Sequence, residues 1–269
     1  MRELTNEEFK STELRILKVF DKYCRENNLK YSLAEGTLIG AVRHKGFIPW
    51  DDDIDVMMPR IDFDRFAGSF HVEGYQLDKV SEDSKWPQFY MRLSDVRTKV
   101  IFEKDKDWRI FHSGVWIDII PIDNFPDSDS ELKCQERKLY VMFKLYRASL
   151  RNHFLPSSGF LRNIAWLSLK FISLFISRSR LREKIIKTMC TYNDKKTSRR
   201  GFLTSYWHHP WIFPARCFEG TIELEFENSR FQAIKGYDEY LRSEYGDYMQ
   251  LPPEKKRVAR HGFRTYWVD

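Results

Sequence analysis

The sequence predicts an α+β fold, in which helices flank a mixed β-sheet core and a helical insertion interrupts the chain. Two apolar segments, residues 53–59 and 115–122, have the composition of buried strands. Amphipathic patterns at the N-terminus and within residues 127–177 predict helices, and residues 237–245 are predicted to form a helix that ends at Gly246. With 269 residues, of which 42% are apolar, the chain can bury one large core or two modest ones.

The first elements are predicted to be a helix, a short strand and a tight turn. Thr5 and Glu8 form a capping-box signature, and apolar residues follow at helical spacing. A short strand at residues 31–33 then leads to Gly36 and Thr37. Glycine lets the backbone approach a phosphate, and the next helix offers unpaired N–H groups at its start. Gly36 and Thr37 are therefore predicted to bind phosphate.

Four aspartates follow within five positions, namely Asp51, Asp52, Asp53 and Asp55. Their mutual repulsion predicts a cation between them, most simply a metal ion. In a strand at residues 53–59, Asp53 and Asp55 point to one face, and Ile54, Val56 and Met58 point to the other. Asp51 and Asp52 are then outer-shell ligands, a general base, or residues of a structural loop.

Three kinds of site contain such an Asp-x-Asp pattern. A calcium-binding helix-loop-helix would need Gly in place of Val56 and Glu in place of Asp62. A haloacid-dehalogenase-like phosphatase has its apolar strand before the first aspartate, whereas here the apolar residues follow it. A nucleotidyltransferase-like site has a Gly-Ser or Gly-Thr turn, a short helix and Asp-x-Asp on the next strand, which is the order found here. A solvated acidic turn is the structural alternative.

The apolar segment at residues 115–122 contains one acidic residue within its run, Asp118. An unpaired carboxylate in such a strand is costly, so Asp118 is predicted to be the third metal ligand with Asp53 and Asp55. Residues 88–96 and 98–102 are expected to form a strand pair. Arg92, on the first of these strands, is a candidate phosphate ligand if its face lines the cleft.

Three segments together resemble the LicD family of phosphocholine transferases, which have a nucleotidyltransferase-like fold. They are residues 36–55, the tripeptide at 116–118 and the motif at 245–253. The resemblance implies transfer of phosphocholine, or a similar phospho-alcohol, from CDP-choline or another CDP-alcohol. The acceptor that the resemblance implies is a hydroxyl of a cell-surface glycan precursor, which belongs to teichoic acid, lipooligosaccharide or capsule. The transfer would release CMP. The chain departs from the family pattern at residues 223–231, which bears on acceptor contacts more than on chemistry.

Two divalent ions, Mg²⁺ or Mn²⁺, are expected on Asp53, Asp55 and Asp118, clamping the donor diphosphate. The carboxylates alone do not distinguish transfer of the head group from transfer of a nucleotide to a small molecule, because both need the same metal clamp. The resemblance favours transfer of the head group. The basic residues predicted to contact the donor phosphates lie in two clusters, Arg43, His44 and Lys45, and Lys256, Arg257 and His261. The structural alternatives are a helix end matched to its dipole and a solvated charged tail.

The predicted organisation is a catalytic core at residues 1–126, a helical insertion at 127–200 and a C-terminal segment at 201–269 that completes the catalytic unit.

Within the insertion, residues 160–177 are predicted to form a helix with a wide apolar face, which is too short to span a bilayer and is followed by basic residues. Such a helix lies either on an anionic membrane near a lipid-linked glycan acceptor or inside a helical subdomain. After it, Tyr206, Trp207 and Trp211 form an aromatic cluster, which either boxes the quaternary ammonium of choline or belongs to the core.

Charge and cysteine content limit the kinds of binding partner and the cellular compartment that can be expected for the protein. The formal charge of +6 and the pI near 9.0 favour an anionic partner. Nucleic acid is not expected, because the basic clusters are dispersed among acidic residues and no recognition motif occurs. The four cysteines are far apart and the N-terminus has no apolar signal region, which predicts a cytoplasmic protein, peripheral on the inner face of the membrane if the helix binds there. A catalytically silent scaffold is the remaining alternative.

Overall fold

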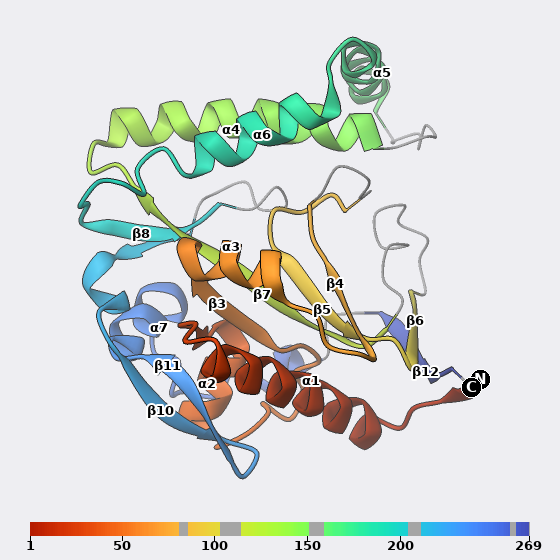
Figure 1. Ribbon diagram of the computed structural model, residues 1–269, viewed down its shortest axis with the longest axis vertical. Helices are drawn as coiled ribbons and strands as arrows, with labels where there is room; N and C mark the ends of the chain where they lie inside the picture. The colour runs from red at the N-terminus through yellow and green to blue at the C-terminus, as the bar shows by residue number, and fades with distance from the viewer. Residues whose placement is uncertain (81–85, 103–113, 151–158, 204–210, 259–261, 269) are drawn as a thin grey trace. The chain divides into compact units, whose positions relative to one another are not determined.

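Figure 1 shows the computed structural model, which describes residues 1–80, 86–102, 114–150, 159–203, 211–258 and 262–268. The chain divides into two compact units. The first comprises residues 1–79, 90–122 and 213–269, and the second residues 80–89 and 123–212. Helices and a mixed sheet occur together, so the predicted α+β class is confirmed.

The main sheet of the first unit is built on β3 (Asp55–Pro59) and β7 (Trp116–Phe125), which pair in parallel. Three antiparallel pairings extend it: β2 (Ser32–Leu33) with β3, β5 (Met91–Asp95) with β7, and β4 (Tyr75–Asp78) with β5. The strand order is therefore β2-β3-β7-β5-β4. Both kinds of pairing occur, so the sheet is mixed, as predicted.

Three helices pack against this sheet: α1 (Asn6–Glu26) contacts β5, and both α2 (Glu35–Arg43) and α3 (Arg60–Ser69) contact β3. The predicted capping box of α1 is confirmed, since Thr5 and Glu8 each accept from the backbone N–H of the other. Val56, Met57 and Met58 are all buried, as is usual for a strand covered on both faces. Burial of Val56 and Met58 is as expected, and Met57, on the same face as Asp55, is buried as well.

A second sheet has the order β1-β12-β6, from β1 (Arg2–Glu3), β12 (Phe263–Trp267) and β6 (Thr98–Phe102). The predicted pairing of residues 88–96 with 98–102 is wrong, because β5 pairs with β4 and β7 whereas β6 pairs with β12. The reason lies at Asp95, whose carboxylate accepts from the backbone N–H of Arg97 and whose carbonyl accepts from the hydroxyl of Thr98. These bonds turn the chain out of the first sheet.

The C-terminal part of the first unit begins with a 3₁₀ turn, η1 (Ala215–Phe218), and a hairpin of β10 (Thr221–Phe226) and β11 (Ser229–Ile234). Glu227 and Asn228 form its two-residue turn, both with positive φ, which matches the right-handed twist of the strands. Then come α7 (Tyr237–Tyr245) and a second 3₁₀ turn, η2 (Glu254–Lys256). The predicted end of α7 at Gly246 is confirmed, with φ of 65° at that glycine.

The second unit is mainly helical, with α4 (Asp129–Leu150), α5 (Phe160–Leu174) and α6 (Arg178–Met189). The end of β7 pairs with β8 (Arg199–Phe202), and β8 pairs with β9 (Trp211–Pro214). In Figure 1, α4 and α6 run side by side and α5 is seen end on. Leu139, Phe143 and Tyr146 of α4 and Leu181, Ile185 and Met189 of α6 form much of the core cluster. Among the described residues, no helix is both long and apolar enough to cross a membrane.

Candidate functional site

The turn at the start of α2 lies against the acidic loop. A β-carbon at position 36 would lie 2.3 Å from Oδ2 of Asp51, so a side chain there would displace that carboxylate. The hydroxyl of Thr37 accepts a hydrogen bond of 2.9 Å from the backbone N–H of Asp55. The Gly-Thr turn thus contacts both the loop and the strand that carry the aspartates.

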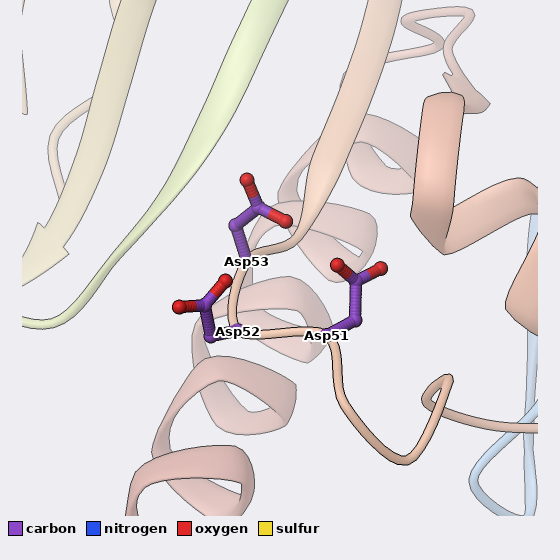
Figure 2. Close-up of side chains that lie close together, drawn as sticks. All are labelled: Asp51, Asp52 and Asp53. Atoms are coloured by element: carbon purple, nitrogen blue, oxygen red, sulfur yellow. The ribbon is translucent and has the colours of Figure 1, made fainter. Parts of the chain in front are cut away.

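Figure 2 shows the three carboxylates of the loop, Asp51, Asp52 and Asp53. A ligand oxygen from each lies within 4.8 Å of the others, and all three residues are half-buried. The backbone N–H of Asp51 donates to the carbonyl of Ile48 at 2.9 Å, which closes the turn before the cluster. Within the part of the chain that the structure describes, this is the group of acidic residues close enough to share one ion.

Asp55 and Asp118 lie opposite each other on the parallel strands β3 and β7. β3 begins at Asp55, so Asp53 belongs to the loop before the strand, and not to the strand itself. Desolvation and the charges of Asp53 and Asp118 raise the pKa of Asp55 well above its ordinary value. Negative charge is therefore concentrated where the acidic loop enters the sheet.

Arg92 binds one of these carboxylates. It lies opposite Asp118 in the pairing of β5 with β7, and its guanidinium donates to both oxygens of that residue. The same guanidinium lies over the ring of Trp116, 4.4 Å from the ring centroid, and the Arg92 side chain is buried. The cation predicted to contact phosphate is thus an ion-pair partner of Asp118.

Glu35, which precedes Gly36, is a buried carboxylate that the sequence reasoning missed. The hydroxyls of Tyr240 and Tyr245 each donate to one of its oxygens, and the residue has a positive φ of 48°. Burial raises the pKa of Glu35 to about 7, although the two hydroxyls act in the opposite direction. The pair of tyrosines fixes the start of α2 to the region of α7.

Glu13 is a second missed carboxylate. It is 1% exposed, and its Oε2 has no hydrogen-bond partner among the described residues. Desolvation, followed by the charges of Asp53, Asp52 and Asp51, raises the pKa of Glu13 well above its ordinary value. One signal could have revealed it: Phe9, Glu13 and Leu17 are spaced four residues apart, so the glutamate interrupts the apolar stripe of α1.

The predicted basic clusters are divided between structural contacts and the surface. The guanidinium of Arg43 donates to the backbone carbonyl of Tyr248, which ties α2 to the C-terminal segment. Arg257 lies over the ring of Trp50, 5.5 Å from its centroid, directly before the acidic loop, and His44 contacts the same ring. Lys45 and Lys256 are exposed, and His261 lies outside the described residues.

The hairpin that departs from the family pattern supports the loop leading to the aspartates. Oε1 of Glu227 accepts from the backbone N–H of Phe47 at 3.1 Å, and the Glu227 backbone N–H donates to the carbonyl of Lys45 at 2.9 Å. A β-carbon at Gly46 would lie 2.2 Å from that same Oε1. The segment at residues 223–231 thus reaches the loop before the acidic cluster, and this contact could not be read from the chain order.

The predicted aromatic box is described only in part. Trp211 lies in β9 and packs on Phe202 with 5.0 Å between ring centroids. Tyr206 and Trp207 lie outside the described residues.

Comparison with known proteins decides the family. A relative from Haemophilus influenzae, a lipopolysaccharide cholinephosphotransferase LicD, is 32% identical over 273 residues, which cover 99% of each chain. The chain belongs to the LicD family. The family model described as "LicD/FKTN/FKRP, nucleotidyltransferase domain" matches residues 28–117 of the chain described here. An uncharacterized protein of Rickettsia typhi is 36% identical over 86 residues, which cover 30% of this chain and 26% of that protein.

The matched segment contains the Gly-Thr turn, the acidic loop and Arg92, which supports the sequence-based assignment to LicD. Three groups described above lie outside it: Glu13 on α1, Asp118 on β7, and the tyrosines that hold Glu35. The groups around the acidic loop and the start of α2 therefore come from more of the chain than the family model covers.

Proposed function

We propose that this LicD protein transfers phosphocholine from CDP-choline to a hydroxyl of a cell-surface glycan precursor and releases CMP. The similarity to a lipopolysaccharide cholinephosphotransferase along 99% of both chains supports this activity. The observation that carries the proposal is the convergence of the carboxylates of Asp51, Asp52 and Asp53 beside the paired Asp55 and Asp118. Such a cluster suits the transfer of a phosphoryl group from a diphosphate.

The residues present fit a divalent cation. The donor set consists only of carboxylate oxygens, which suits Mg²⁺ or Mn²⁺ better than softer metals. The pKa of Asp55, which the charges of Asp53 and Asp118 help to raise, and the orphaned oxygen of Glu13 suit a site that a cation would complete. Asp51, Asp52, Asp53, Asp55 and Asp118 would hold the cation, and two such ions are expected. A bound cation would neutralise the donor diphosphate and lower the pKa of the acceptor hydroxyl.

The protein's own groups position the donor. Gly36 leaves room for the carboxylate of Asp51 against the α2 turn. Gly36 and Thr37 remain candidate phosphate contacts through the N–H groups at the start of α2. The guanidinium of Arg257 lies over the ring of Trp50, so a permanent positive charge lies next to the acidic loop. Lys256 directly precedes it in the sequence. Arg92 holds the carboxylate of Asp118 in place through two hydrogen bonds. Arg43, His44, Lys45 and His261 remain candidate phosphate contacts.

The similarity to a cholinephosphotransferase supports a chemical step at the phosphorus that carries choline. The oxygen of the acceptor hydroxyl attacks the phosphorus that carries choline, and a new P–O bond forms. The P–O bond to CMP breaks, and CMP leaves with that electron pair. The proton of the hydroxyl passes to a carboxylate of the loop, either Asp51 or Asp52. Tyr206, Trp207 and Trp211 remain candidates for binding the quaternary ammonium of choline.

The acceptor is a lipid-linked glycan, and the enzyme works in the cytoplasm at the inner face of the membrane. The Haemophilus relative is a lipopolysaccharide cholinephosphotransferase, which supports an amphiphilic acceptor.

The test is a panel of CDP-choline, CDP-ribitol, CDP-glycerol and CDP-ethanolamine with Mg²⁺ and lipid-linked glycan acceptors, scored by CMP release and product mass. Asp53→Asn is expected to lower CMP release by at least about 100-fold. Asp64→Asn, an exposed aspartate on α3, is the matched control and is expected to be active. Transfer of a CMP moiety to the product, or unchanged CMP release by Asp53→Asn, would refute the proposal.

A further inference from the structure

The helix α5 has its polar side turned toward the protein. Ser173 is 5% exposed, and its hydroxyl donates to the carbonyl of Lys170 within the helix. The ammonium of Lys170 reaches across to α4 and donates to the carbonyl of Ala148 at 3.1 Å. The polar stripe of this amphipathic helix is therefore the side that packs on its own unit.

The apolar side of α5 is correspondingly exposed. Phe171 is 63% exposed, and Phe175, which follows the helix, is 76% exposed. Their rings contact each other edge to face, with 5.1 Å between the ring centroids. Other large apolar side chains of the helix are also exposed: Phe160, Ile164, Leu167, Ile172 and Leu174. Among the described residues, the core cluster of the second unit takes none from α5. A continuous apolar surface of this kind marks a binding face.

The charge near this face is predominantly positive, although Glu183 on α6 is exposed as well. Residues 137–182 contain ten Lys or Arg and no Asp or Glu, whereas the whole chain has a formal charge of +6, so this segment carries all of the net positive charge. Arg178 and Arg180 follow Phe175 by three and five residues, within about 20 Å of it along the chain, and both are exposed. Lys184 and Lys187 continue the exposed basic surface on α6.

We infer that the exposed face of α5 binds the surface of an anionic phospholipid membrane. The helix would lie in the plane of the membrane with its apolar side chains below the headgroups and the cations of α6 beside lipid phosphates. With 15 residues it is about 22 Å long, which suits an interfacial helix and not a membrane-spanning one.

A second copy of the chain fits this face less well. A twofold contact places the same surface of both copies together, and here it would bring two strongly basic segments against each other. An anionic membrane instead supplies both the apolar layer and the opposite charge. The biological reason for this contact, access to a lipid-linked acceptor, rests on the proposed function, but the contact itself does not.

The test is flotation of the full-length protein with vesicles of phosphatidylcholine containing 30% phosphatidylglycerol, in parallel with pure phosphatidylcholine vesicles. The wild-type protein is expected to float with the anionic vesicles, and 0.5 M NaCl is expected to weaken this binding. The double variant Phe171→Glu/Phe175→Glu is expected to stay in the soluble fraction. Arg178→Gln/Arg180→Gln is expected to bind roughly 25-fold more weakly, at about fivefold for each cation removed.

Ile61→Glu is the matched control, because Ile61 is 71% exposed on α3 in the first unit and its replacement is expected to leave flotation unchanged. All variants are compared by circular dichroism and size-exclusion chromatography with light scattering. The inference is overturned if wild type stays soluble with anionic vesicles, or if Phe171→Glu/Phe175→Glu floats as wild type does. It is also overturned if that variant only converts a dimer into a monomer. Phe171→Glu/Phe175→Glu is expected to release CMP at the normal rate with a water-soluble glycan acceptor. Membrane binding and the proposed transfer activity are therefore tested by separate measurements.

Discussion

The guanidinium of Arg92 donates hydrogen bonds to both carboxylate oxygens of Asp118, and the two residues are paired on β5 and β7. Asp118 is paired in turn with Asp55 on β3. A carboxylate of the site thus has a permanent cation on one side and another carboxylate on the other. The ion pair limits repulsion between Asp118 and Asp55 before any metal or substrate arrives.

Removing Arg92 is expected to leave Asp118 as an uncompensated buried charge. We expect Arg92→Met to lower the free energy of unfolding by about 3 kcal/mol, measured by urea denaturation in EDTA. In the double variant Arg92→Met/Asp118→Asn, most of this loss is expected to be recovered, because the isolated charge is gone as well. Strictly additive effects of the two substitutions would show that the ion pair does not stabilise the fold.

Glu13 is predicted to contribute to metal binding, because its buried and unpaired carboxylate oxygen lies in the field of the three aspartates of the loop. We expect Glu13→Gln to weaken Mn²⁺ binding by about tenfold, measured by isothermal titration calorimetry, with the fold retained. Glu26→Gln, an exposed position near the end of the same helix, is the control and should bind Mn²⁺ as wild type does. Equal affinity of Glu13→Gln and wild type would assign Glu13 a purely structural role.

Asp95 is predicted to make the fold sensitive to acid. Its buried carboxylate accepts from the guanidinium of Arg15 at 2.9 Å and from that of Arg97 at 2.6 Å. Burial acts to raise the pKa of Asp95, but its hydrogen bonds to Arg97 and Arg15 outweigh burial and hold that pKa below its ordinary value. A lowered pKa in the folded state means that the carboxylate stabilises the protein above about pH 4, and that this contribution is lost as pH falls further.

We therefore expect Asp95→Asn to lower the free energy of unfolding by about 3 kcal/mol at pH 7 and by clearly less at pH 3. Urea denaturation at both values measures the difference. Asp129→Asn is the control, since its ion pair with Arg199 is exposed and its loss should matter little. A pH-independent difference between Asp95→Asn and wild type would contradict the role of the ionised carboxylate.

Local patterns predicted much of the fold. The capping box at Thr5 and Glu8 and the terminal Gly246 of α7 involve neighbours in sequence, so composition and spacing determine them. The apolar runs around Asp55 and Asp118 likewise predicted two buried strands, and these are adjacent in the sheet. The mispairing of residues 98–102 arose because the partner, β12, lies more than 150 residues away.

The rest of the site depends on contacts that no local pattern encodes. Glu35 gains its role only when Tyr240 and Tyr245 reach it from about 200 residues later. Glu227 lies in the segment at residues 223–231 that we expected to depart from the LicD family pattern. Its contact with Phe47 joins residues 180 positions apart, so only the three-dimensional structure reveals it. Glu13 could have been found, since a glutamate within an apolar helical stripe needs a reason to be buried.

The contacts of the last quarter of the chain have a consequence for synthesis. The acidic loop and the start of α2 leave the ribosome early, but Glu227, Tyr240 and Arg257, which hold this region, follow only after about 170 to 220 further residues. Until then the nascent chain carries a dense group of aspartates without the groups that shape it. A chain truncated before residue 213 would therefore contain every carboxylate of the site and still lack a formed active centre.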